Sequence, residues 1–271
     1  MLLDGCSPDP APWLPLVLAG GLYGVGVHRL HIRGRHWSPW RSASYYTGLL
    51  AIAAALISPL AAHDELFAVH MVQHLLLGML GPVLLSLSAP VTLALRTLPR
   101  KSRRPLVRLL HSRVLGMLAH PLTAAFLFAA GVYLLYLTPL YAQTLRHPML
   151  HALIHIHFLL SGCLFAWTFI GLDPVPRRGS LGMRVVLLTA ALGAHAALAK
   201  LLYAGAGASL TRAIRLADLH AGAQLMYYGS DGVDLLILVA FFSRWYAAGG
   251  RRLERERRRH APATGAGVTP A

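Results

Sequence analysis

Seven apolar runs, each close to the length of a membrane-spanning helix, constrain the fold of this chain more than any other feature of its sequence. A helix needs about 20 apolar residues to cross the hydrocarbon core of a bilayer. The runs cover approximately residues 12–28, 43–62, 66–89, 114–138, 150–172, 183–204 and 219–246. Only 13% of the residues are charged, well below the share of about 25% in soluble domains. The sequence therefore predicts an all-α, polytopic membrane protein, with a bundle of seven transmembrane helices in residues 1–246.

The Lys and Arg residues lie mainly in alternate connections between these runs. Of the 25 basic residues, 21 fall within 29–41, 96–113, 177–184 and 244–259, which the seven-span topology places on one side. Cytoplasmic loops of membrane proteins carry such an excess. We therefore expect the N-terminus outside and the C-terminus in the cytoplasm. This placement also accounts for the net charge of +15 without nucleic acid as a partner.

Residues 247–271 follow the last apolar run. The segment contains the charged run RRLERERRRH at 251–260 and ends in APATGAGVTPA, which has little apolar surface to bury. We expect a basic, disordered cytoplasmic tail whose first turns form a short helix on anionic membrane lipids.

Six histidines are predicted to gather in the outer third of the bilayer: His63, His70, His74, His151, His155 and His220. The third run contains His70 and His74, four residues apart, and the fifth run repeats this spacing. Residues four apart lie on one face of a helix. Both runs enter from the outer side, and at about 1.5 Å per residue the two pairs lie at similar depth.

Such a cluster has the chemistry of a metal site, because neutral imidazole is the commonest metal ligand in proteins. Two facing pairs offer four nitrogens, a set that suits copper or zinc. A polar packing network between helices is the structural alternative. Haem is a further alternative, held for example between His74 and His155.

The motif His70-Met-Val-Gln-His74 also has the histidine spacing of the zinc-protease motif HExxH. Met71 replaces the glutamate that acts there as general base, so peptide hydrolysis is disfavoured. A metal-dependent hydrolase would have to use Asp64, Asp218 or Asp231 as its base.

The seventh run carries a stripe of polar residues along one side. The stripe consists of His220, Gln224, Tyr227, Asp231 and Asp234, and Asp218 comes just before it. These spacings of three and four place the stripe within an arc of about 80° on a helix. A carboxylate in lipid costs several kcal/mol, so we expect the stripe to face protein or water. His195 and Lys200 of the sixth run are candidate partners of Asp231. Two interpretations remain open, a proton or ion relay and a buried structural seam.

Three segments resemble the CtaG family of cytochrome c oxidase assembly proteins, of the multi-helix type. They are HMVQHLLLGMLGPVLL, HALIHIHFLLSGCLFAW and the Asp218-Leu-His-Ala-Gly element with Met226-Tyr-Tyr. The resemblance extends from about Pro12 to Tyr246. It implies a bacterial plasma-membrane protein that acts in maturation of a haem–copper oxidase. The motif histidines of the family correspond to His70, His74, His151 and His155, and its Asp–Gly element corresponds to Asp218 and Gly222.

We therefore expect a non-enzymatic assembly factor in the bacterial inner membrane. It would bind copper, rather than zinc or haem, at the outer histidine cluster. Its partners would be haem–copper oxidase subunits and membrane lipids. The alternatives from other classes are a haem-binding membrane redox protein and a metal-dependent intramembrane hydrolase.

Overall fold

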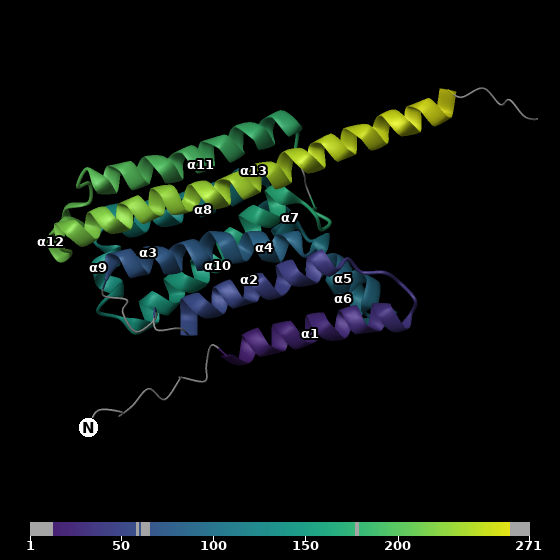
Figure 1. Cartoon of the computed structure of the whole chain (residues 1–271), viewed down its shortest axis with the longest axis horizontal. Helices are drawn as coiled ribbons and strands as arrows, with labels where there is room; N and C mark the ends of the chain where they lie inside the picture. Colours follow the sequence, from purple (N-terminus) through teal and green to yellow (C-terminus); the bar gives the residue numbers. More distant parts are fainter. Residues whose placement is uncertain (1–12, 58–59, 61–65, 177–178, 261–271) are drawn as a thin grey trace, which may run out of the picture.

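A computed structural model of the chain describes residues 13–57, 60, 66–176 and 179–260, and these residues form helices and their connections, with no strand among them. The long helices run side by side in an elongated bundle (Figure 1). In chain order the helices are α1 (Trp13–Ile32), α2 (Pro39–Ile57), α3 (Phe67–Leu75), η2 (Leu76–Leu80), α4 (Gly81–Leu87), α5 (Pro90–Thr97), α6 (Arg100–Leu110), α7 (Arg113–Leu118), α8 (Pro121–Leu137), α9 (Leu140–Thr144), α10 (Pro148–Ile170), α11 (Leu181–Tyr203), α12 (Ala208–Ala213) and α13 (Leu216–His260).

Within the described residues, four helical segments are long and apolar enough to cross a membrane: Phe67–Leu87, Pro148–Ile170, Leu181–Tyr203 and Leu216–Gly250. A fifth apolar helix, Pro121–Leu137, is shorter. The all-α membrane class is therefore supported by the described residues. The count of seven spans and the direction of insertion stay predictions.

Local sequence signals set where several of these helices begin. Proline, whose missing N–H costs nothing in the first turn, opens α8 and α10. The side chains of Ser112 and Ser180 accept hydrogen bonds from amides in the first turns of α7 and α11, at 3.2 Å each. The basic stretch 96–113, expected as a connection, itself folds largely into α6 and the ends of α5 and α7.

The segment α3–η2–α4 is one continuous helix that widens to a π turn at Leu76–Leu80. It packs against α2, α10 and α13. The backbones of this helix and α10 are in direct contact where Gly78 meets Gly162. A Cβ added at Gly162 would collide with the carbonyl oxygen of Gly78. Small residues allow such close approach of helices in membranes. π turns often mark functional sites, and this one directly follows His74.

Helix α13 is the longest element, with 45 residues, and it continues through the basic segment to His260 without a break. Figure 1 shows it extending well beyond the rest of the bundle. The first part of the expected tail is thus the end of the last long helix. Residues 261–271 lie outside the described part of the chain.

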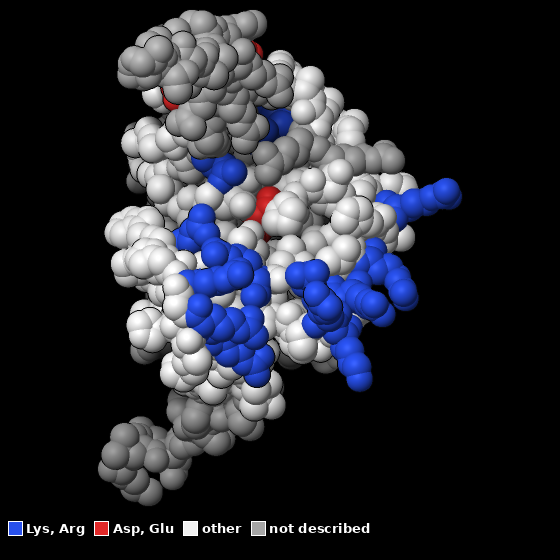
Figure 2. All heavy atoms as spheres, turned by 90° about the vertical axis from the view of Figure 1, so that its right-hand side faces the viewer, with Lys and Arg blue, Asp and Glu red and all other residues white. Residues whose placement is uncertain are grey.

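Basic side chains gather at one end of the bundle, the right-hand end in Figure 1, as Figure 2 shows. Exposed residues there include Arg100, Lys101, Arg103, Arg104 and Arg108 of α6. The structure therefore brings basic connections of the sequence together at one end. The histidine-bearing first turns of α3 and α10 lie toward the opposite end.

Candidate metal centre

Three histidines from two helices converge near the first turns of α3 and α10. One ring nitrogen from each of His70, His151 and His155 lies within 4.8 Å of the other two. Within α10, the Nε2 atoms of His151 and His155 are 3.1 Å apart, as expected for residues one turn apart on one face. The ring centre of His70 on α3 lies 6.0 Å from that of His151 and 6.2 Å from that of His155. We call these three residues the histidine triad.

The triad has a buried side and an open side. His70 is 2% exposed, whereas His151 and His155 are partly exposed. The Nε2 atom of His70 is buried and has no hydrogen-bond partner among the described residues. A buried polar atom without a partner destabilises a protein by about 1–3 kcal/mol, so an ion that binds this nitrogen would remove that penalty. The triad therefore fits a cation that enters from the α10 side.

Asp218, at the start of α13, fixes the beginning of α3 one turn before His70. Its carboxylate oxygens accept hydrogen bonds from the backbone N–H of Phe67 at 2.7 Å and of Ala68 at 3.1 Å. These amides have no partner within their own helix, and a negative charge is favourable at a helix N-terminus. One turn along α13, Gly222 leaves room for the ring of Phe67, which an added Cβ would strike. The Asp–Gly element therefore positions α3 and, through it, His70.

His74 does not join the triad. Its Nε2 atom faces the Nε2 atom of His195 on α11 at 3.4 Å, and both side chains are buried. At this depth α10 presents the ring of Phe158, 4.7 Å from that of His74, in place of a further histidine. Three of the four expected histidines thus form the triad, and the fourth, His74, pairs with His195. We call His74 and His195 the inner histidine pair.

The other two histidines of the predicted cluster are not part of the triad. His63 lies outside the described residues. His220 stacks on Tyr203 of α11, with ring centres 4.4 Å apart.

A family model described as cytochrome c oxidase caa3 assembly factor matches residues 21–248. The chain belongs to this family. The resemblance to CtaG proteins is thereby confirmed.

Among curated relatives, uncharacterised proteins of Mycobacterium bovis and Mycobacterium tuberculosis are each 38% identical over 264 residues, which cover 91% of this chain and 40% of theirs. An uncharacterised protein of Mycobacterium leprae is 34% identical over 266 residues, which cover 92% of this chain and 40% of its own. The chain thus spans about 40% of the length of these relatives. No solved structure matches it.

The residues of the polar stripe of α13 lie in different surroundings. Gln224 and Asp231 are exposed on the outside of the bundle, and Asp234 is half-buried. Lys200 lies over the ring of Tyr227, with its Nζ atom 5.1 Å from the ring centre. His195, the other candidate partner of Asp231, instead faces His74. The stripe therefore does not form one continuous chain of polar contacts among the described residues.

Asp173 is an ordered carboxylate that the sequence interpretation did not single out. It is 2% exposed and accepts hydrogen bonds from the backbone N–H of Val91 at 3.0 Å and from the N–H and hydroxyl of Thr92 at 2.6 Å each. It thus begins α5 as Asp218 begins α3. Its partners are about 80 residues away, so the sequence offered only the signal of an Asp before a Pro.

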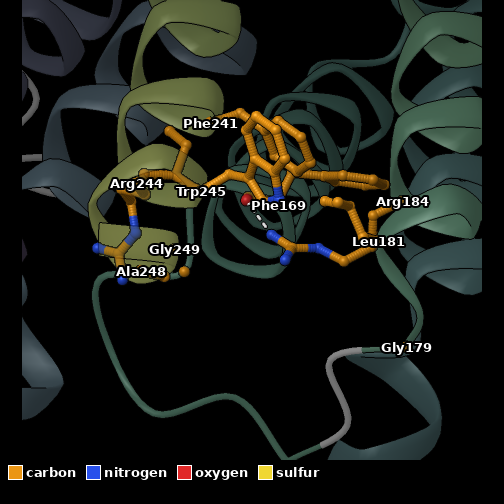
Figure 3. A pocket seen from close by; sticks show the side chains of 11 residues that line it. Phe169, Gly179, Leu181, Arg184, Phe241, Arg244, Trp245, Ala248 and Gly249 are labelled. Carbon is orange, nitrogen blue, oxygen red and sulfur yellow. Dashed lines mark hydrogen bonds between the residues drawn. The ribbon is translucent and has the colours of Figure 1, made fainter. Parts of the chain in front are cut away.

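A hollow of about 410 Å³ lies at the other end of α10 (Figure 3). It is lined by the start of α11 and by side chains within residues 241–249 of α13. Arg184 enters it from α11 and donates hydrogen bonds to the carbonyl oxygens of Thr168 and Phe169. Its guanidinium also lies 4.9 Å from the ring centre of Phe241. Because the last carbonyls of a helix lack partners within it, Arg184 serves here to close the end of α10.

Proposed function

We propose that this caa3 assembly factor binds copper at the histidine triad and supplies it to a copper-containing subunit of a haem–copper oxidase. The observation that carries the proposal is the convergence of three imidazole nitrogens within 4.8 Å of one another, from a set in which His70 also has a buried Nε2 atom without a partner among the described residues. The family supplies the second part, because its members are described as assembly factors of a cytochrome c oxidase.

The character of the triad agrees with a transfer site. Three neutral imidazoles hold a metal without the thiolates of a storage cage, and protonation of the ligands releases the ion. Two of the three ligands are partly exposed, so an ion has a short route in and out. Imidazole suits copper and zinc alike, and the oxidase context favours copper.

Two features weigh against the alternative functions. Both carboxylate oxygens of Asp218 accept hydrogen bonds from amides of α3, and Asp231 is exposed on the outside of the bundle, so neither is held beside the triad as the base of a hydrolase. Asp64, the third candidate base, lies outside the described residues. His74, the haem ligand expected opposite His155, instead faces His195, and the ring of Phe158 packs against it with ring centres 4.7 Å apart.

Copper binding by the purified full-length protein tests the proposal. His151→Ala should lose the copper equivalent that the triad holds, because it removes one of three ligands. His157→Ala is the matched control, since this histidine lies on the same helix and turns toward Gly131 of α8. Equal copper binding by the wild type and the His151→Ala variant would refute the site.

A further inference from the structure

The inner histidine pair is not explained by the triad or by ordinary packing. His74 and His195 come from α3 and α11, and both are buried in the centre of the bundle. Their Nε2 atoms are 3.4 Å apart, which is longer than the 2.7–3.2 Å of a normal hydrogen bond from N–H. The Nδ1 atom of each ring is also buried without a hydrogen-bond partner among the described residues. Polar groups buried in this state call for a physical reason.

The two rings have a particular mutual orientation. They are nearly coplanar, at 11°, and their centres are 5.7 Å apart. The distance between ring centres exceeds the distance between the Nε2 atoms by about the width of one imidazole ring. Both Nε2 atoms therefore lie close to the line that joins the ring centres. The lone pairs of two neutral imidazoles would point at one position from opposite sides.

We propose that His74 and His195 form a second, inner copper site, which takes Cu(I) in linear two-coordination. With metal–nitrogen bonds of about 2.0 Å, the two nitrogens must separate to about 4 Å, a shift of roughly half an ångström. Zn²⁺ prefers four ligands in a tetrahedron and Cu(II) four in a plane. The neighbouring rings of Phe128 and Phe158 carry no ligand atom, and the third neighbouring ring, that of Tyr136, carries only a hydroxyl, which is a poor ligand for a soft ion such as Cu(I) when it is neutral. A monovalent d¹⁰ ion is satisfied by two ligands, and its single charge is also the cheapest to bury.

The inner site continues the route of the ion from the triad. His70 belongs to the triad and His74 to the inner pair, and four residues of helix separate them by about 6 Å along the axis. The HxxxH motif of α3 therefore joins two sites that lie one turn apart along the same helix. This link between the sites rests on the proposed function, whereas the geometry of the inner pair stands without it.

The experiment measures Cu(I) bound by the full-length protein in detergent, without oxygen, against a chromophoric Cu(I) chelator. The wild type and the His157→Ala control should bind two equivalents. The His195→Ala variant should bind one, held by the triad. The double variant His151→Ala/His155→Ala should also bind one, and its X-ray absorption should show two nitrogen ligands at about 2 Å.

Each outcome supports or overturns one of the two proposed copper sites. Two equivalents in His195→Ala, or a first shell of three or more ligands in the double variant, would overturn the inner site. Loss of copper in His195→Ala alone, with none lost in the double variant, would support the inner site and refute the triad. If His195→Ala does not fold, His195→Gln replaces it, because the amide keeps a polar side chain of similar reach. Thermal unfolding of each variant identifies that case.

Discussion

The contact between Asp218 and the first turn of α3 gives the sharpest prediction for stability. Asp218→Ala removes two hydrogen bonds, of 2.7 and 3.1 Å, between a carboxylate and backbone amides. Bonds to a charged group contribute about 1.5–3 kcal/mol each when they are well buried. Asp218 is only partly buried, and both hydrogen bonds are part-buried, so they contribute less than fully buried bonds would. We therefore expect a loss of about 2 kcal/mol, at the upper end of the range for a helix N-cap.

The assay is thermal unfolding of the purified protein, followed by tryptophan fluorescence. A change of about 2 kcal/mol corresponds to a decrease in Tm of about 4–8 °C for a chain of this size. Asp218→Asn keeps one acceptor oxygen without the charge, so its Tm should fall between those of the wild type and Asp218→Ala. Asp231→Ala is the matched control, because Asp231 lies on the same helix and is exposed. Equal Tm values for the two alanine variants would refute the capping role.

Two further variants test the packing that holds the sites in place. Gly162→Ala should destabilise the protein by about 1–3 kcal/mol, because its Cβ meets the backbone of Gly78 and the two helices must separate. Gly193→Ala, whose Cβ meets nothing within 4 Å, should keep or slightly raise Tm, because alanine favours a helix over glycine. A Gly162→Ala protein as stable as Gly193→Ala would contradict the close helix crossing. Asp173→Ala should speed amide hydrogen exchange in the first turn of α5 while α3 stays protected, and unchanged exchange at Val91 and Thr92 would show that the cap is dispensable.

The sequence was sufficient to predict the all-α membrane class, and it singled out the three histidines that converge at the candidate site. The spacing of His151 and His155 predicted a shared face, and their nitrogens are 3.1 Å apart. The same spacing did not reveal that His70 and His74 meet different partners, His151 and His155 of α10 for His70 and His195 of α11 for His74. The helices packed beside α3 decide which partner each histidine ring contacts, and the spacing of residues within one helix does not reveal those neighbours.

The roles of the acidic residues were the least accessible to sequence reasoning. Asp218 was placed in a polar stripe by its position on a helix, but its partners are amides 150 and 151 residues earlier in the chain. The exposed position of Asp231 likewise depends on how α13 is rotated against α3 and α11. The resemblance identified Asp218 and Gly222 as a motif, and the contacts with α3 give the physical reason for it.

The copper content of the terminal oxidase tests the central claim most directly. Cells that lack the gene would be complemented with the wild type, with His151→Ala/His155→Ala or with His157→Ala, at equal membrane levels of each protein. The account predicts a copper-deficient, inactive oxidase with the double variant and a fully metallated oxidase with the other two. A fully metallated, active oxidase in cells carrying the double variant would contradict it.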